Sequence, residues 1–206
     1  MVAVKKLSAQ MDFSDTVFLD EVTNLMRLKH ENIVRLLGYC ADSQGEVMQV
    51  ERLGYQIAEE PQRLLCFEYV PNGNVQHYLK EKSYGFEWVI RYQIIKGICQ
   101  GVGYLHRERI NHLDLKPENV LLGAHMVPKI TDFGLSRCFA GSNSTMFTKN
   151  IIGTLGYIAP ELIDRGQISS KSDIYSLGII MIKLLLGSDE IDRDNVSRIL
   201  NFYLSM

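Results

Sequence analysis

The chain has 206 residues, and its 22 lysines and arginines against 24 aspartates and glutamates leave a formal net charge of −2. This near-balance argues against a nucleic-acid-binding protein, which normally carries a clear basic excess. With 46% hydrophobic and 22% charged residues, the composition is that of a globular protein with one large domain or two small lobes. The longest apolar stretch, 177–187, contains Lys183 and is far shorter than the ~20 residues of a membrane span.

The four cysteines are spread along the chain without a C-x-x-C pair: Cys40, Cys66, Cys99 and Cys138. This spacing suggests neither a zinc site nor a disulfide framework, so we expect buried thiols in a reducing compartment. No basic-then-apolar signal segment opens the chain. The composition therefore predicts a soluble, cytoplasmic protein and does not define its chemistry.

The first seventy residues combine strand and helix patterns. The β-branched run 2–5 predicts a strand. Apolar residues at helical spacing over 15–29 predict an amphipathic helix. Two further apolar runs, 33–37 and 64–67, predict strands, and the polar segment 41–63 between them is either a long loop or an extended hairpin.

A strong turn signal, PNGN at 71–74, separates this part from the rest. We place the boundary between two lobes there, so that the domains cover 1–70 and 71–206. Residues at alternating intervals of four and three then predict a long helix with one buried face: Trp88, Tyr92, Ile95, Cys99, Val102 and His106.

Short strands and loops follow over 110–135, and a very apolar helix comes after them. Ser172 is the expected N-cap of that helix. The helix contains the apolar residues Leu177, Ile180, Met181 and Leu184. A strand-and-helix half followed by a helical half indicates an α+β protein with two lobes.

The residues best suited to chemistry lie close together in the second half. Asp114 and Asn119 stand five residues apart in HLDLKPEN, and Asp132 opens DFG thirteen residues later. Asn119 and Asp132 offer the oxygen ligands that Mg²⁺ prefers. Asp114 is a suitable proton acceptor, and Lys116 can neutralise charge on a transferred group. Together they fit phosphoryl transfer, which needs held cations, a positioned hydroxyl and a group to take its proton.

Residues outside this cluster fit the same chemistry. Lys5 on a predicted strand and Glu21 on a predicted helix could form an ion pair that aims the ammonium at phosphates. Taken alone, such a pair would be a surface ion pair worth roughly 0–1 kcal/mol. Downstream, the segments 153–154 and 159–161 would close the loop that receives a substrate.

The individual motifs also have simpler explanations. Asp132 alone could be a turn aspartate, and Asp114 with Asn119 could be a loop of self-capping residues. His112 alone is expected to be a packed or hydrogen-bonded histidine. These simpler explanations become weaker because the motifs DFG, at 132–134, and APE, at 159–161, follow the Asp114–Asn119 loop in the expected order.

Taken together, the motifs resemble those of a eukaryotic protein kinase of the serine/threonine type, most like the plant receptor-like kinases. Six motifs occur in the order of that family: VAVK at 2–5, a helix glutamate at 21, HLDLKPEN at 112–119, DFG at 132–134, GTLGYIAPE at 153–161 and SDIYSLG at 172–178. One such match would be weak evidence for the family, but six matches in the family's order are strong evidence. The phrases HENIVRLLGYC at 30–40 and PKITDFGLSR at 128–137 point to the plant receptor-like branch. The resemblance implies a two-lobed α+β kinase-like fold, with a small β-rich N-lobe and a mainly helical C-lobe.

The resemblance also implies the roles of the catalytic residues. Asp114 would be the catalytic base, with Lys116 beside the γ-phosphate of ATP. Asn119 and Asp132 would hold Mg²⁺. Asp173 would anchor the catalytic loop from the central helix.

It further implies how nucleotide binds. Lys5 would contact the α- and β-phosphates and pair with Glu21. The adenine ring would be surrounded by the backbone of Glu68 and Val70, the gatekeeper Phe67, and the side chains of Ala3 and Leu121. A stacked apolar column of the active state would consist of Leu25, Leu36, Phe133 and His112.

The implied function is a protein kinase domain that transfers the γ-phosphate of ATP to a protein Ser or Thr hydroxyl in receptor-like kinase signalling. Lys116 with Thr154 favours Ser/Thr over Tyr acceptors. We expect a protein substrate, no nucleic acid and a cytoplasmic location, or the cytoplasmic face of the plasma membrane in a longer receptor. The candidate phosphorylation sites are Ser142, Ser144, Thr145 and Thr148.

Three departures from the family pattern carry expectations of their own. No G-x-G-x-x-G occurs in the sequence, and the apolar helix lies near the end, so we expect both lobes to be incomplete and nucleotide binding to be weak. Glu161 would then lack its usual arginine partner. Leu113 replaces the arginine that commonly precedes the catalytic aspartate, and leucine cannot bind an activation-loop phosphate. The alternative function is therefore a catalytically impaired kinase-like interaction module.

Overall fold

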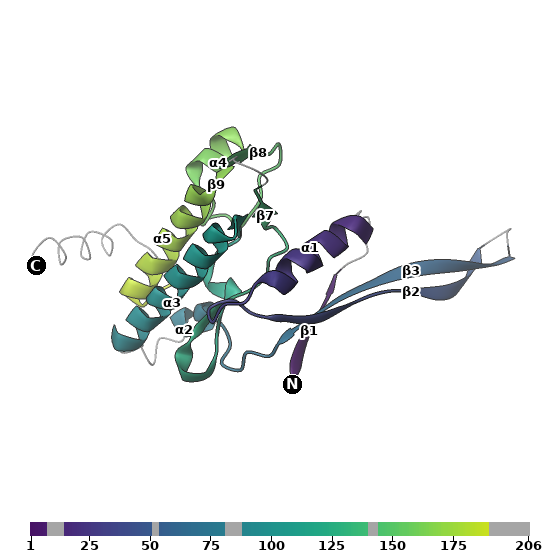
Figure 1. Ribbon diagram of the computed structural model, residues 1–206, viewed down its shortest axis with the longest axis horizontal. Helices are drawn as coiled ribbons and strands as arrows, with labels where there is room; N and C mark the ends of the chain where they lie inside the picture. Colours follow the sequence, from purple (N-terminus) through teal and green to yellow (C-terminus); the bar gives the residue numbers. More distant parts are fainter. Residues whose placement is uncertain (8–14, 51–53, 81–87, 140–143, 190–206) are drawn as a thin grey trace, which may run out of the picture. The chain divides into compact units, whose positions relative to one another are not determined.

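The computed structural model describes residues 1–7, 15–50, 54–80, 88–139 and 144–189 (Figure 1). The chain divides into two compact units. Unit 1 comprises Met1–Lys29 and Val34–Tyr69, and unit 2 comprises His30–Ile33 and Val70–Met206.

The described residues of unit 1 form an antiparallel sheet and one helix. The strands β1 (Val2–Leu7), β3 (Gly54–Glu68) and β2 (Leu36–Val50) lie in the order β1-β3-β2, and α1 (Asp15–Arg27) packs on β2. The predicted strand at 2–5 and the predicted amphipathic helix are thus confirmed. Apolar residues spaced along α1 are buried: Phe18, Val22 and Leu25.

The strands β2 and β3 form a long hairpin. Their register runs from Leu36 opposite Phe67 to Val50 opposite Gly54, so the extended hairpin is the correct alternative for 41–63. The strand predicted at 33–37 begins only at Leu36, because Ile33 belongs to unit 2, where it makes an isolated bridge to Ile130.

Two helices form the core of unit 2. Helix α3 (Trp88–Arg107) and helix α5 (Ser170–Leu186) pack against each other, and they run side by side in Figure 1. The predicted buried face of α3 is wrong at Trp88, Tyr92 and Cys99, which are exposed. The residues that are buried on α3 are Ile94, Ile95, Gly97, Ile98, Gly101, Val102 and Leu105.

Close packing at two glycines decides which face of α3 is buried. A Cβ at Gly97 would collide with Pro128, and one at Gly101 would come within 2.9 Å of the Ile130 side chain. Aromatic and aliphatic residues have similar helical spacing in this sequence, so periodicity did not distinguish the two faces. Because glycine has no Cβ, the strand that carries Pro128 and Ile130 can come close only to the face of α3 that contains Gly97 and Gly101.

The N-cap of helix α5 lies three residues before the predicted one. Its N-cap is Ser169, whose Oγ accepts a hydrogen bond from the Lys171 N–H at 3.2 Å. Ser172 is inside the helix, and its Oγ accepts from the Ser169 N–H at 3.3 Å. The prediction of Ser172 as N-cap is wrong because the two serines cap reciprocally, as in a capping box.

The described residues of unit 2 also form three two-stranded ladders and several short helical segments. The pairs are β4 (Ile110–Asn111) with β7 (Arg137–Cys138), β5 (Val120–Leu122) with β6 (Pro128–Ile130), and β8 (Thr145–Phe147) with β9 (Gln167–Ser169). The short segments are α2 (Val75–Lys80), η1 (Pro117–Asn119), η2 (Ala124–Met126) and α4 (Pro160–Arg165).

The cysteines differ from the expectation based on composition. The four cysteines are free thiols, but the prediction that all are buried is wrong, since Cys99 and Cys138 are exposed and Cys40 and Cys66 are half-buried. Cys99 lies on the outer face of α3, and Cys138 lies in a ladder of only two strands. None of the described helices has the length and hydrophobicity needed to cross a membrane.

Candidate active site

The Asp114 carboxylate is surrounded by hydrogen-bond partners. It lies in the loop between β4 and β5, the catalytic loop (112–119). The Thr154 hydroxyl donates to Asp114 Oδ1 at 2.6 Å, and Lys116 Nζ lies 3.0 Å from Oδ2. Asn119 Nδ2 donates to Oδ2 at 3.1 Å and to the Asp114 main-chain oxygen at 2.8 Å. The carboxylate is therefore oriented by three side chains.

Lys116 and Thr154 form a bridge of their own. Lys116 Nζ donates to Thr154 Oγ1 at 2.8 Å, so the Thr154 hydroxyl accepts from the lysine while it donates to Asp114. Sequence analysis associated Thr154 with acceptor preference and missed this contact. The two residues are 38 positions apart, and no local pattern indicates the contact.

A hairpin brings Asn119 next to the residues before Phe133. In the β5–β6 ladder, Val120 pairs with Ile130, and the Thr131 N–H donates to the Asn119 main-chain oxygen at 3.0 Å. Asn119 and Asp132 therefore flank the same end of the ladder. Neither hydrogen bond of the Asn119 side chain uses its Oδ1, which is the atom that a cation would bind.

The donor set at this end of the ladder fits magnesium. Among the described residues, no group of three or more His, Cys, Asp and Glu side chains could hold a metal. Mg²⁺ does not need such a group, because it is usually held by one or two protein oxygens together with substrate phosphates and water. The amide oxygen of Asn119 and the carboxylate of Asp132 match that requirement.

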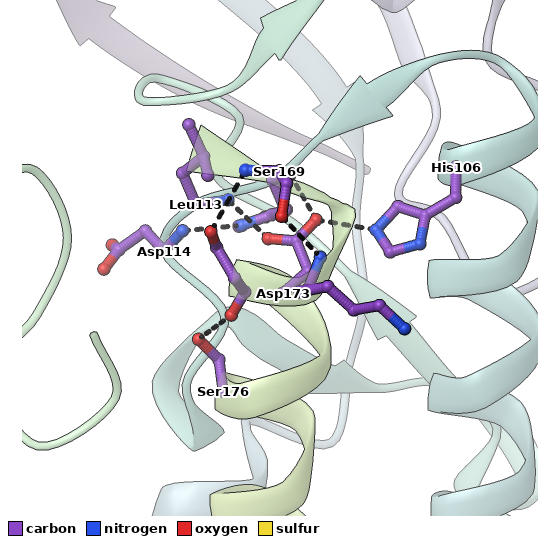
Figure 2. A network of polar contacts seen from close by, with 9 residues as sticks. His106, Leu113, Asp114, Ser169, Asp173 and Ser176 are labelled. Carbon is purple, nitrogen blue, oxygen red and sulfur yellow. Dashed lines mark hydrogen bonds and ion pairs between the residues drawn. The ribbon is translucent and has the colours of Figure 1, made fainter. Parts of the chain in front are cut away.

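Asp173 anchors the catalytic loop from α5, as predicted. Its carboxylate is fully buried and accepts from the His112 N–H at 2.9 Å and from the Leu113 N–H at 2.8 Å. Figure 2 shows Asp173 between His106 and the Leu113 backbone, with the Asp114 carboxylate directed away from it. His106 Nε2 lies 2.9 Å from Asp173 Oδ2, a contact across 67 residues that sequence analysis missed.

The Asp173 contacts stabilise an uncommon backbone conformation. Leu113 has a φ of 65°, in the left-handed region that residues with a Cβ rarely adopt. Two charge-assisted hydrogen bonds to adjacent amides offset the strain of this turn. The turn directs the next residue, Asp114, away from α5 (Figure 2).

His112 has a structural position beneath the loop. It is completely buried, its Nδ1 accepts from the Asp114 N–H at 3.2 Å, and its Nε2 lies 2.9 Å from the Thr131 main-chain oxygen. Because a backbone N–H can only donate, Nδ1 is the acceptor and Nε2 carries the proton. The ring is 5.0 Å from that of Phe133, which confirms this pair of the predicted column.

Burial keeps His112 neutral. Removal from water lowers its pKa below the ordinary value of 6.5, and this outweighs the opposite effect of the carboxylates of Asp173, Asp114 and Asp132. The neutral imidazole can accept one hydrogen bond and donate another, which is what the two neighbouring backbone groups require. His112 thus connects the catalytic loop to the segment that precedes Phe133.

The predicted nucleotide-binding residues of unit 1 lie on adjacent strands. In the β1–β3 ladder, Ala3 is opposite Phe67 and Lys5 is opposite Leu65. The Glu68 N–H donates to the Arg35 main-chain oxygen at 3.0 Å, and the Arg35 N–H donates to Glu68 Oε1 at 2.9 Å.

Other predicted contacts to nucleotide stay predictions. The Glu21 side chain lies outside the described part of the chain, so its pairing with Lys5 is not tested. Val70 and Leu121 belong to unit 2, and Leu121 pairs with Lys129 in the β5–β6 ladder. Ser142 also lies outside the described residues.

Comparison with known proteins identifies the family. The protein kinase domain family matches residues 1–203. The chain belongs to the protein kinase domain family. The predicted α+β kinase fold and the resemblance to plant receptor-like kinases are confirmed.

Plant receptor-like protein kinases are among the relatives of this kinase domain. Cysteine-rich receptor-like protein kinase 36 of Arabidopsis thaliana is 37% identical over 191 residues, which cover 90% of this chain and 26% of that protein. Cysteine-rich receptor-like protein kinase 29 of the same plant is 40% identical over 194 residues, with coverage of 90% and 26%. A G-type lectin S-receptor-like serine/threonine-protein kinase is 36% identical over 191 residues, with coverage of 90% and 21%. The chain thus spans about a quarter of the length of these relatives.

Proposed function

We propose that this kinase domain transfers the γ-phosphate of ATP to a Ser or Thr hydroxyl of a protein. The family itself implies ATP-dependent phosphotransfer to protein substrates. The observation that carries the proposal is the orientation of the Asp114 carboxylate by Thr154, Lys116 and Asn119. Such preorganisation is what a proton acceptor beside a reacting hydroxyl requires.

In the proposed reaction, the acceptor oxygen forms a bond to the γ-phosphorus, and the bond from that phosphorus to the β-phosphate oxygen breaks, so that ADP leaves. The hydroxyl proton passes to the Asp114 carboxylate. Lys116, which lies 3.0 Å from Asp114 Oδ2, stabilises the charge that grows on the transferred phosphoryl group. Thr154 holds Oδ1 by its 2.6 Å hydrogen bond, which keeps the carboxylate in place for the incoming hydroxyl.

Asn119 and Asp132 are the proposed magnesium ligands. When bound, Mg²⁺ would neutralise phosphate charge. The hydrogen bonds from Asn119 Nδ2 to Asp114 fix the orientation of the amide, so its Oδ1 is held ready on the opposite side. The Asn119–Thr131 backbone bond ties this ligand to the strand that leads to Asp132.

For the nucleotide itself, we propose the residues implied by the family motifs. Lys5, paired with Glu21, would contact the α- and β-phosphates. The adenine site would be formed by Ala3, Glu68, Val70 and Leu121. The position of Ala3 and Glu68 on the paired strands β1 and β3 supports this assignment.

The Lys116–Thr154 bridge beside Asp114 supports Ser/Thr acceptors, and one relative is named a serine/threonine-protein kinase. We propose a cytoplasmic location, or the cytoplasmic face of the plasma membrane if the chain is part of a longer receptor. The alternative of a non-catalytic interaction module is not favoured by the family match.

The direct test is the substitution Asp114→Asn, which removes the proton acceptor but keeps the size of the side chain. Transfer of labelled γ-phosphate to a protein substrate should fall about 10²- to 10⁴-fold. Asp164→Asn, at an exposed position of α4, is the matched control and should leave the rate unchanged. Phosphate incorporation that is equal in the wild type and in Asp114→Asn would contradict the assignment.

A further inference from the structure

The outer part of the β2–β3 hairpin has no third strand beside it among the described residues. Strand β1 pairs only with Arg63–Glu68 of β3. Beyond that point, β2 and β3 pair with each other over 42–50 and 54–62. We call these two stretches the outer hairpin, and Figure 1 shows that it extends past β1 and α1 of the same unit. A two-stranded hairpin is only marginally stable in water, so a surface that covers it would stabilise it.

The outer hairpin is poorly suited to accept a further strand where it leaves the sheet. Ser43 lies opposite Pro61 in the ladder. The Ser43 N–H donates to Asp42 Oδ1 at 2.9 Å, and proline has no N–H to offer. Edges that are blocked in this way are protected against pairing with another chain. We therefore expect a partner to cover a face of the outer hairpin and not to extend its edge.

The outer hairpin carries only negative charge. It has no Lys or Arg, and its four acidic residues are Asp42, Glu46, Glu59 and Glu60. Its formal charge of −4 compares with −2 for the whole chain, so the rest of the chain has a net charge of +2. The three glutamates fall in consecutive pairs of the ladder. This concentration of negative charge favours a basic partner.

The outer face of α3 is exposed and apolar at its beginning. Trp88, Val89 and Tyr92 are 54%, 59% and 55% exposed. The Trp88 and Tyr92 rings lie 6.5 Å apart between their centroids. Adjacent exposed aromatic and aliphatic side chains mark surfaces that bind other molecules.

The same face of α3 is also basic. Lys96 and Arg107 are exposed, and the helix contains no Asp or Glu. A third basic residue, Arg91, is engaged at the end of α5, where its Nη1 donates to the main-chain oxygens of Leu184 at 3.4 Å and Leu185 at 3.3 Å. Lys96 and Arg107 therefore supply the positive charge of the outer face.

The outer hairpin and the outer face of α3 match in length as well as in charge. Helix α3 has 20 residues, which at ~1.5 Å per residue span about 30 Å. The nine residues of each strand in the outer hairpin, at ~3.3 Å per residue, also span about 30 Å. One surface is acidic and the other is basic, so the two are complementary.

We infer that the outer hairpin of one molecule binds the outer face of α3 of a second copy of this chain. Lys96 and Arg107 of one copy meet the acidic residues of the other, and the hairpin covers Trp88 and Tyr92. A contact of about 30 Å by 10 Å is smaller than the roughly 800 Å² per partner of a stable complex, so the dissociation constant should be about 10–100 μM. The inference is independent of the proposed function, because neither surface contains a residue assigned to catalysis or nucleotide binding.

Sedimentation equilibrium of the 206-residue chain is the first test. The average mass should rise above that of one chain between about 5 and 300 μM at about 50 mM salt. The rise should disappear at about 500 mM salt, because exposed charges are then screened. A chain that stays monomeric at about 300 μM and low salt would overturn the inference.

The fluorescence of Trp88 reports the α3 face directly, because the sequence contains one tryptophan. The acrylamide quenching constant should fall about twofold over the concentration range in which the mass rises, since the interior of an interface excludes water. Association without any change in quenching would place the contact on another surface. Protection of Trp88 that is independent of concentration would place it within one molecule. Either result would contradict the inference.

Removal of the outer hairpin tests the other partner of the contact. Ala41 lies opposite Arg63, so an Asn-Gly turn in place of 42–62 closes the hairpin and keeps the sheet with β1. This variant should remain monomeric, and its Trp88 quenching should equal that of the dilute wild type at all concentrations. Self-association as strong as in the wild type would exclude the outer hairpin as the binding surface.

Charge reversal tests the pairing and does not depend on the folding of the deletion variant. Glu59→Lys with Glu60→Lys should raise the dissociation constant at least about tenfold, and Lys96→Glu with Arg107→Glu should do the same, because like charges then face each other. The variant with all four substitutions should return to within about threefold of the wild type, because the charges are then exchanged between the surfaces.

The matched control for the hairpin pair is Glu31→Lys with Asp164→Lys, at two exposed positions outside both surfaces. It changes the net charge by the same amount and should leave the dissociation constant within about twofold of the wild type. Equal weakening by the control would show a general effect of net charge and contradict the inference. So would a four-substitution variant that associates no better than the two pairs.

Discussion

The catalytic loop is held on two sides by different forces. On the α5 side, the buried Asp173 carboxylate accepts hydrogen bonds from the backbone of His112 and Leu113 and lies 2.9 Å from His106 (Figure 2). On the side of the activation segment, residues 132–161, the Leu113 side chain packs among apolar residues such as Phe139 and Ile158. One residue, Leu113, takes part in both.

The two sides have different physical properties. Hydrogen bonds depend steeply on direction and distance, so the Asp173 side fixes where the backbone before Asp114 points. Apolar packing depends mainly on filled volume and tolerates small displacements. We conclude that the polar side sets the direction of the backbone before Asp114, whereas the apolar side packs the Leu113 side chain against residues such as Phe139 and Ile158.

The largest expected effect comes from breaking the polar side. Asp173→Ala leaves the buried N–H groups of His112 and Leu113 without their acceptor. We expect the free energy of unfolding to fall by about 3 kcal/mol or more, since each unsatisfied buried donor costs about 1–3 kcal/mol. Urea unfolding measures the change, and Asp164→Ala on the surface of α4 should stay within about 0.5 kcal/mol. A loss below 1 kcal/mol for Asp173→Ala would mean that apolar packing alone holds the loop.

Acid should weaken the polar side through His112. Its pKa is lowered in the folded protein, chiefly by burial, so the unfolded chain binds more protons than the native chain below the ordinary value of 6.5. The contribution of His112 to stability is therefore complete above about pH 6.5 and is lost as the pH falls, with a slope of up to about 1.4 kcal/mol per pH unit.

Urea unfolding between pH 7 and pH 5 tests this prediction. His112→Asn cannot be protonated, so the unfolding free energy of that variant should vary less with pH than that of the wild type. The carboxylates that face His112, those of Asp173, Asp114 and Asp132, act in the opposite direction but are outweighed by burial. Equal slopes in the two proteins would show that other groups cause the acid sensitivity.

The smallest expected effect is a gain in stability on the polar side. Asn111 precedes His112 and is 2% exposed, and its Nδ2 has no hydrogen-bond partner among the described residues. Asn111→Leu removes this unsatisfied donor and should raise the free energy of unfolding by about 1 kcal/mol. Asn150→Leu, at an exposed position, should change it by less than about 0.5 kcal/mol. A loss of stability in Asn111→Leu would show that the polar side depends on this amide as well.

Local patterns predicted some elements well and others poorly. The first strand was predicted from the β-branched run at 2–5, and α1 was predicted from apolar residues that repeat with the period of a helix. The buried face of α3 was mispredicted because Trp88 and Tyr92 have the same helical spacing as the buried isoleucines, and the close approach at Gly97 decided between them. The start of α5 was misplaced because Ser169 and Ser172 both act as capping residues.

The sequence by itself determined which residues carry the proposed chemistry. Asp114, Lys116 and Asn119 lie within one short loop, where the chain itself brings their side chains close together. Of the groups that hold them, Asp173, 61 residues after His112, was expected from the family resemblance, whereas only the tertiary structure showed the contact of Thr154, 40 residues after Asp114. Contacts at such separations arise from the packing of α5 and the activation segment, and neither periodicity nor spacing along the chain records that packing.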